Sequence, residues 1–274
     1  MIRRPPQYVS SDLSLYRFAR GLLAGGLRLY GRYEATGAWR LPASGPAIVV
    51  ANHPSDIDPI ILGVAFSRPL RFMADAVQFR RGFVGRVIPR LGAFPVRKGE
   101  ADRAALRTAL DLLAAGEVVA LFPEGDQYSD DAMHRFERGI GYLAAASGAP
   151  VVPAAITGSH AISDRRWLAR PTIRLTVGEP IDLGGLDDRG HDACARRADL
   201  IEAAVRELRE QGELAEQRDA ARRRERADDG QWREPETELR WDERGDAGSC
   251  EWPREAGLGE GDDAVEPDGE PAGI

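Results

Sequence analysis

The chain of 274 residues has one lysine, two cysteines and no long apolar run, and each shortage excludes a class of protein. The cysteines, Cys194 and Cys250, are too few for a disulfide framework or a thiolate metal cluster, so we expect a reducing compartment. No stretch approaches the roughly 20 apolar residues that a membrane-spanning helix needs. No uninterrupted apolar core follows Met1, so we expect no signal peptide. Any contact with a bilayer is therefore expected at its surface.

Charge is unevenly distributed along the chain. Residues 1–200 carry 26 basic and 21 acidic side chains, whereas residues 201–274 carry 11 basic and 23 acidic ones. The basic excess is concentrated in the first hundred positions. A cationic leading part favours an anionic partner, and a membrane surface and nucleic acid both have that charge. Nucleic-acid binding would also need aromatic residues interleaved with the basic ones on a folded face. That pattern is weak here, so we expect no nucleic-acid partner.

An amphipathic helix is predicted over residues 13–33. At about 100° per residue, four arginines fall on one face: Arg17, Arg20, Arg28 and Arg32. The opposite face is apolar, with Leu15, Phe18, Leu22, Leu29 and Tyr33. Such a helix suits a bilayer surface, which predicts a membrane-docking region over residues 1–35. A helix that packs on its own domain and exposes its arginines has the same pattern.

From about residue 46, short apolar runs alternate with helical patterns. Strands are predicted at residues 47–51, 70–74, 93–96, 117–122, 151–156 and 172–177. Helices are predicted at residues 58–67, 100–115, 136–147 and 192–226. This succession predicts an α/β domain over residues 36–226, with a mixed, mostly parallel open sheet flanked by helices. Residues 227–274 are acidic and poor in aliphatic side chains, so a disordered tail is predicted there.

The first segment with chemical potential is Asn52-His53-Pro54-Ser55-Asp56-Ile57-Asp58, directly after a predicted strand. Ligands of open α/β sheets bind at the carboxyl ends of strands. A turn at Pro54 would let the carboxylate of Asp58 hold one ring nitrogen of His53. The second nitrogen would then be a general base for a hydroxyl proton.

Three other interpretations of this segment remain open. Ser55 as a nucleophile would need a glycine-rich elbow, which is absent, so a turn or cap hydroxyl fits it better. Asp56 can replace Asp58 as the partner of the ring. A zinc site would need a third protein ligand, and no nearby histidine or cysteine provides one, so no metal is expected.

Three further segments follow predicted strands. Arg97 and Lys98, beside a glycine in Gly92-Ala-Phe-Pro-Val-Arg-Lys-Gly99, are two adjacent cations that suit a phosphate. Glu124 and Gly125 end the run Phe-Pro-Glu-Gly; the carboxylate can accept a hydrogen bond from a hydroxylated substrate, and the glycine allows close approach of backbone. The run Val-Pro-Ala-Ala-Ile-Thr-Gly at residues 152–158 is interpreted mainly as a core strand.

In this order, NHPSDID, GAFPVRK, FPEG and VPAAITG resemble the four motifs of the glycerophospholipid acyltransferases, in particular the 1-acylglycerol-3-phosphate acyltransferases. The resemblance covers residues 12–180. It implies that His53 and Asp58 are the catalytic dyad, that Arg97 helps to hold the acceptor phosphate, and that Glu124 and Gly125 line the acceptor site. It also implies a mixed sheet with a membrane-docking N-terminal region. The donor would be acyl-CoA or acyl-carrier protein, with no metal or cofactor, at the cytoplasmic face of the cell membrane.

The chain departs from the family pattern at three positions. Asp126 and Gln127 follow FPEG where the family commonly has a small residue and then arginine, and Asp75 stands where it commonly has lysine. These changes remove positive charge expected near the acceptor phosphate. From the four motifs we expect acyl transfer to 1-acylglycerol-3-phosphate, and the lost positive charge makes a less anionic lipid acceptor the alternative. A non-enzymatic membrane-binding module would leave the four ordered motifs unexplained.

Overall fold

The computed structural model describes residues 13–30, 32–97, 102–125, 132–163, 172–183 and 190–229. The chain divides into two units, Met1–Ala227 and Asp228–Ile274. Almost all of the second unit, and with it most of the predicted tail, lies outside the described residues. Lys98, Asp126, Gln127 and Cys250 also lie outside them. The predicted domain boundaries at residues 35 and 226 stay predictions.

A seven-stranded sheet forms the centre of the first unit, in the order β1-β7-β6-β2-β5-β3-β4. Its strands are β1 (Arg32–Thr36), β2 (Ala47–Ala51), β3 (Leu70–Asp75), β4 (Phe94–Val96), β5 (Val118–Leu121), β6 (Val151–Thr157) and β7 (Thr172–Val177). Neighbouring strands pair in parallel except β6 and β7, which are antiparallel. Five strands, β6-β2-β5-β3-β4, therefore run in one direction and end at one edge of the sheet. The predicted mixed, mostly parallel sheet is confirmed.

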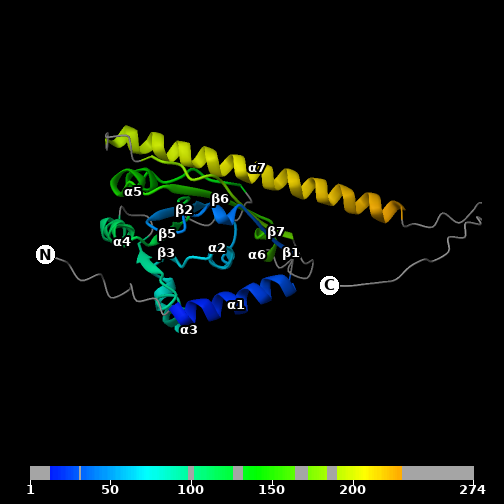
Figure 1. Ribbon diagram of the computed structural model, residues 1–274, viewed down its shortest axis with the longest axis horizontal. Helices are drawn as coiled ribbons and strands as arrows, with labels where there is room; N and C mark the ends of the chain where they lie inside the picture. The colour runs from blue at the N-terminus through cyan, green and yellow to red at the C-terminus, as the bar shows by residue number, and fades with distance from the viewer. Residues whose placement is uncertain are drawn as a thin grey trace, which may run out of the picture. The chain divides into compact units, whose positions relative to one another are not determined.

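Helices cover both faces of the sheet. They are α1 (Leu13–Tyr30), α2 (Asp58–Ala65), α3 (Gly82–Val87), α4 (Arg103–Ala114), α5 (Gly139–Ser147), α6 (His160–Ser163) and α7 (His191–Asp229), with 3₁₀ turns η1 (Ala38–Arg40) and η2 (Gln78–Arg80). In Figure 1, α5 and α7 lie above the sheet, whereas α1 lies below it.

Side chains of the central strands alternate between two apolar cores. In β2, Ile48 and Val50 pack in the core that also contains residues of α4, α5 and α7, whereas Val49 and Ala51 pack in the core that also contains residues of α1 and α2. This alternation is the period-two pattern of a strand. Every residue of β2 is buried because both faces are covered, which explains its uninterrupted apolar sequence.

The first predicted helix ends earlier than expected. It stops at Tyr30, and Arg32 and Tyr33 begin β1 instead of continuing the helix to residue 33. β1 is an edge strand that pairs only with β7. The paired residues Arg32 and Thr172 are 140 positions apart in the sequence. Its residues are mostly exposed, so they lack the apolar alternation that would have identified it.

Helix α1 packs on the domain through one face and leaves another open. Tyr16 and Leu27 are buried, and the Tyr16 hydroxyl donates to the carbonyl oxygen of Gly63 at 3.4 Å. Phe18 and Leu22 are 70% and 67% exposed. The helix therefore packs on its own domain and still presents apolar residues outward, and the membrane-docking role stays a prediction. Among the described residues, no helix is both long enough and apolar enough to cross a bilayer.

Candidate active site

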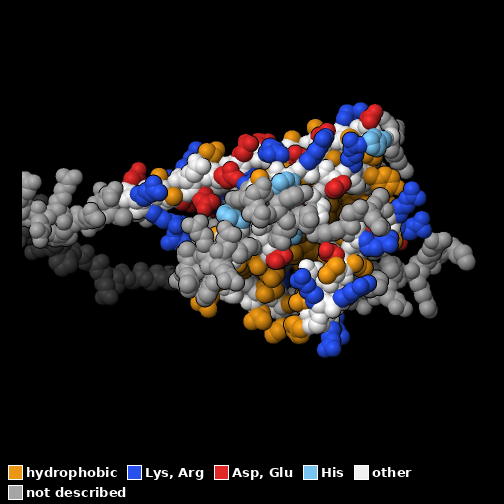
Figure 2. All heavy atoms as spheres, turned by 180° about the vertical axis from the view of Figure 1, so that it is seen from behind, with side chains coloured by type: hydrophobic (Ala, Val, Ile, Leu, Met, Phe, Trp, Pro, Cys, Tyr) orange, Lys and Arg blue, Asp and Glu red, His pale blue; other side chains and the backbone are white. Residues whose placement is uncertain are grey.

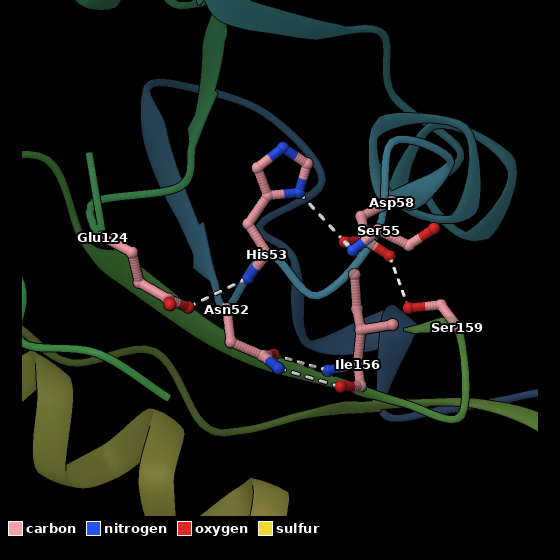
Figure 3. A network of polar contacts seen from close by, with 7 residues as sticks. All are labelled: Asn52, His53, Ser55, Asp58, Glu124, Ile156 and Ser159. Carbon is pink, nitrogen blue, oxygen red and sulfur yellow. Dashed lines mark hydrogen bonds and ion pairs between the residues drawn. The ribbon is translucent and has the colours of Figure 1, made fainter. Parts of the chain in front are cut away.

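The carboxyl ends of β6, β2 and β5 bring the site together. β2 is the middle strand of these three and leads into Asn52 and His53; β5 leads into Phe122 and Glu124, and β6 into Ser159. Because the three strands are parallel and adjacent, residues far apart in the sequence meet at one edge. Figure 3 shows His53 between the Glu124 side and the Ser159 side.

His53 and Asp58 form the predicted dyad. The Nδ1 atom of His53 lies 2.9 Å from Oδ2 of Asp58. Asp58 begins α2, and its N–H donates to the carbonyl oxygen of Ser55 at 3.0 Å, which closes the turn. Since an ionised carboxylate only accepts, Nδ1 carries the proton and Nε2 keeps its lone pair. The alternative partner Asp56 is exposed, so the structure selects Asp58.

Asp58 is completely buried and is surrounded by donors. Its Oδ2 also accepts from the backbone N–H of Ser55 at 2.7 Å, and its Oδ1 accepts from the hydroxyl of Ser159 at 2.7 Å. Burial raises the pKa of Asp58, and the hydrogen bonds from His53, Ser159 and Ser55 act against that rise. These donors favour the ionised form that the dyad requires.

The imidazole of His53 has a fixed plane. It stacks on the ring of Phe122 with 4.1 Å between ring centroids and 15° between planes, and Phe72 stacks behind Phe122 at 6.5 Å. The His53 side chain is still 20% exposed. In Figure 3 the ring nitrogen that is not bonded to Asp58 points away from the network. A substrate hydroxyl can therefore reach Nε2 while the ring is held on its other side.

Glu124 braces the backbone of the site. One carboxylate oxygen accepts from the N–H of His53 at 3.0 Å, and the other accepts from the N–H of His134 at 3.2 Å. The residue is 6% exposed; burial raises its pKa, and the two N–H groups counteract this. We predicted that Glu124 lines the acceptor site. The structure places it beside His53, where its described contacts hold two loops together, and its role toward an acceptor stays a prediction.

Gly125 adopts a left-handed backbone conformation with φ of 74°. A Cβ atom there would lie 3.3 Å from Cγ of Glu137, whose N–H donates to the carbonyl oxygen of Pro123 at 2.7 Å. Glycine therefore suits this turn on both conformational and steric grounds. A role for Gly125 toward an acceptor stays a prediction.

Three residues of the site were missed or given no role from the sequence. Asn52 bonds the backbone of Ile156 in both directions, through its Nδ2 at 2.9 Å and its Oδ1 at 2.8 Å, which ties the end of β2 to β6. Phe122 supports the ring, and Ser159 holds Asp58. Only their positions could have indicated a role. Asn52 directly follows β2, Phe122 directly follows β5, and Ser159 lies just after β6; β5 and β6 both adjoin β2.

Arg97 lies at the end of β4, away from the dyad. β4 is three strand positions from β2, which corresponds to about 14 Å across the sheet. The Arg97 side chain is 66% exposed, and its Nε lies 3.3 Å from Oδ2 of Asp102. Both residues line a hollow of about 340 Å³ together with Phe94, Pro95, Thr108 and three alanines. The structure thus leaves Arg97 at the same edge but outside the network of His53.

Asp75, one of the departures from the family pattern, ends β3. Its carboxylate accepts from the N–H of Val77 at 2.9 Å, so it stabilises the turn into η2. Among the described residues, no group of three histidine, cysteine or acidic side chains is placed to hold a metal ion. The chemistry that the described groups support is removal of a proton by His53.

Comparisons with known proteins agree with this chemistry. Residues 32–157 match the family model described as Acyltransferase. A 1-acyl-sn-glycerol-3-phosphate acyltransferase of Bacillus subtilis is 29% identical over 168 residues, which cover 61% of this chain and 82% of that protein. A chloroplastic enzyme of the same name from Arabidopsis thaliana is 26% identical over 61% of this chain and 48% of that protein.

A solved structure shares the fold. The crystal structure of the 1-acyl-sn-glycerophosphate acyltransferase PlsC from Thermotoga maritima matches with a TM-score of 0.58 and 25% identity, over 70% of this chain and 79% of that one. The matched family region contains the dyad, the Phe122-Pro-Glu-Gly turn and β6. The family model over residues 32–157, the named relatives and the solved structure together support the glycerophospholipid acyltransferase family, and the relatives named above are O-acyltransferases.

Proposed function

We propose that the protein transfers a fatty acyl group from acyl-CoA or acyl-carrier protein to the free hydroxyl of 1-acylglycerol-3-phosphate, a step of phospholipid biosynthesis. The observation that carries the proposal is the His53–Asp58 pair at 2.9 Å, with its ring partly exposed at the end of β2. The names of the relatives in Bacillus subtilis and Arabidopsis thaliana support the same acceptor.

The reaction needs one base and no covalent enzyme intermediate. Nε2 of His53 takes the proton of the acceptor hydroxyl while the oxygen forms a bond to the thioester carbonyl carbon. The buried carboxylate of Asp58 stabilises the imidazolium that forms. When the tetrahedral intermediate collapses, the carbon–sulfur bond breaks and the thiolate takes the proton from His53. The products are the ester and the free thiol, and His53 returns to its starting state.

The acceptor phosphate is assigned to the neighbourhood of Arg97. The guanidinium is exposed, lies at the shared strand edge, and borders the hollow beside α4. A phosphate there would lie three strand positions from the end of β2, and the acceptor would have to span that separation to place its hydroxyl at His53. Lys98 follows Arg97 directly and is assigned to the same phosphate from the sequence alone.

One observation favours a second candidate, a less anionic lipid acceptor. The charge of Arg97 is partly offset by Asp102, whose carboxylate lies 3.3 Å from its Nε, and Asp75 adds a negative charge at the end of the neighbouring β3. Both acidic groups weaken the attraction of this edge for a phosphate. The acyl-transfer steps at His53 are the same for either acceptor.

The protein is proposed to work at the cytoplasmic face of the cell membrane, attached to its surface by α1. The exposed apolar residues Phe18, Leu22 and Leu29 lie on a helix that contains no acidic residue. Arg17 and Arg28 on the same helix are exposed as well. Apolar side chains can enter the headgroup layer while the arginines attract anionic lipids, which are abundant on the cytoplasmic leaflet.

A competition assay tests the acceptor. The purified protein is given labelled acyl-CoA or acyl-carrier protein and an equimolar mixture of lysophosphatidate and a neutral acyl glycerol, and the products are identified by mass. We expect phosphatidate as the main product. A main product without phosphate would assign the second candidate, and no acylated lipid from any mixture would refute the proposed function.

A further inference from the structure

Between β3 and β4 the chain forms a surface segment, residues 77–90, to which the proposed reaction assigns no role. It contains η2, α3 and the turn that follows. Val77, Phe83 and Val84 in this segment are 57%, 79% and 45% exposed. One exposed apolar residue on a surface is ordinary, but three within a short stretch, one of them an aromatic ring, mark an interaction surface.

The same segment is strongly basic. Its four arginines are all exposed: Arg80, Arg81, Arg86 and Arg90. No acidic residue occurs from Ala76 to Arg97, so the segment contains nothing that neutralises them. Apolar side chains bordered by arginines match the chemistry of an anionic bilayer surface, which offers hydrocarbon beneath a layer of phosphates.

A close backbone approach gives the segment a defined shape. Gly85 in α3 packs against η2, and a Cβ atom at this position would clash with the carbonyl oxygen of Phe79. Only glycine therefore lets α3 fold back onto the preceding 3₁₀ turn. Phe83 and Val84 lie in this folded-back helix and are held outward. The exposed apolar residues thus belong to an ordered surface, as a docking site requires.

The segment lies near the site and on the same side of the domain as α1. It begins two residues after β3, which is two strand positions, or about 10 Å, from β2. In Figure 1, α1 and α3 both lie along the lower edge, opposite α7. Figure 2 shows hydrophobic side chains gathered along that lower edge with Lys and Arg side chains beside them. Two separate basic and apolar segments on one side favour an extended planar partner over a small acidic protein.

We propose that residues 77–90 are a second membrane-docking segment, in which Phe83 enters the headgroup layer and the arginines bind lipid phosphates. The inference rests on the proposed function, because it assumes that the protein works on a bilayer. Two docking segments, α1 and residues 77–90, fix the orientation of the domain as well as its attachment. The strand edge with His53 and Arg97 is then held close to the lipid surface from which the acceptor comes.

Vesicle binding of the full chain tests the segment directly. Partition is measured by sedimentation with vesicles of phosphatidylcholine alone and of phosphatidylcholine with phosphatidylglycerol. One variant carries Arg80→Gln and Arg81→Gln, and another carries Phe83→Ser. The matched controls are Arg222→Gln with Arg224→Gln and Leu200→Ser, which change exposed residues of the same types on α7. Because all these side chains are exposed, the thermal unfolding midpoints are expected to stay unchanged.

The arginine variant is expected to lower partition onto the anionic vesicles roughly 25-fold at low salt, since each arginine near such a surface contributes about a fivefold factor. This difference shrinks at high salt because the charges are screened. Phe83→Ser is expected to lower partition roughly tenfold at either salt concentration. The α7 controls are expected to bind as the unchanged protein does.

Two outcomes would overturn the inference. Unchanged vesicle binding by both segment variants would remove the docking role. Unchanged binding together with slower transfer from acyl-carrier protein would assign the segment to an acidic protein donor instead. Transfer from acyl-CoA to a short-chain, monomeric lysophosphatidate without vesicles is measured in parallel. Its absence in the unchanged protein would refute the proposed function, while the vesicle data would still decide the docking segment.

Discussion

Two ends of the strand edge, one with His53 after β2 and one with Arg97 after β4, are held very differently. At the β2 end, His53 is fixed by three groups at once: Asp58 binds its ring nitrogen, Phe122 stacks on its ring, and Glu124 accepts its backbone N–H. At the β4 end, Arg97 is 66% exposed and its side chain contacts Asp102 over a hollow. The difference separates two tasks. The proposed proton-transfer group is positioned by buried contacts, whereas the proposed phosphate-binding group lies open to solvent.

Among the residues around His53, the largest effect is expected from Asp58→Asn. The amide can donate to Nδ1 of His53, which would move the ring proton to Nε2 and remove the base. We expect turnover to fall about a thousandfold. The measurement is the turnover number at saturating donor and acceptor. Asp56→Asn, an exposed neighbour with the same chemical change, should stay near full activity; a similar loss in that control would contradict the assignment of the partner.

The next effect is expected from Glu124→Gln. The glutamine side chain has one acceptor oxygen for two backbone N–H groups, so either His53 or His134 loses its bond. We expect turnover to fall about thirtyfold because the His53 loop is released, and stability to fall by about 1–3 kcal/mol, the cost of a buried donor without a partner. Glu179→Gln, at an exposed carboxylate, is the control. An unchanged turnover number would show that the brace is not needed for catalysis.

Ser159→Ala removes one of the donors to Asp58 and should have a smaller effect, about a tenfold loss of turnover. Burial already raises the pKa of Asp58, and Ser159 acts against that rise. Without the hydroxyl the pKa rises further, so the ionised form is lost at a higher pH as the solution is acidified. The acid limb of the pH–rate profile should therefore move to higher pH. Ser147→Ala, which removes a hydroxyl from α5, should leave the profile in place.

The smallest effect on the chemistry is expected from Arg97→Ala. We expect about a fivefold rise in KM for lysophosphatidate with little change in kcat, since the phosphate is held away from the base. The Arg97 side chain is 66% exposed, and the buried Asp102 keeps its bonds from the backbone N–H groups of Arg97, Ala104 and Ala105, so the unfolding midpoint should barely move. KM for a neutral acceptor should stay the same. A large loss of kcat would mean that the open end takes part in the chemistry after all.

The contrast also explains what could be predicted from the sequence. Most strands and the mostly parallel sheet follow from short apolar runs that alternate with helical patterns. The His53–Asp58 pair follows from a proline turn and a five-residue spacing. Ser159 and Phe122 became visible only once the sheet placed β6 and β5 on either side of β2. The direction of the Glu124 carboxylate, toward backbone N–H groups, has no signature in side-chain types.

The errors have the same origin. The sequence from Leu29 to Tyr33 continues a helical pattern, and nothing local shows that Arg32 pairs with Thr172 in a strand. No element was predicted over residues 77–90, because α3 has only six residues and is too short for its periodicity to be informative. Burial and strand neighbours, both long-range properties, were needed to identify either.

The most direct test of the central claim is the turnover of His53→Ala with and without added imidazole. Removing the ring leaves a niche between Phe122 and Asp58 at the partly exposed site. If His53 is the general base, turnover should fall at least about a thousandfold and recover in part as imidazole is added, whereas His191→Ala on α7 should match the unchanged protein. Turnover within about twofold of the unchanged protein in His53→Ala would contradict the account.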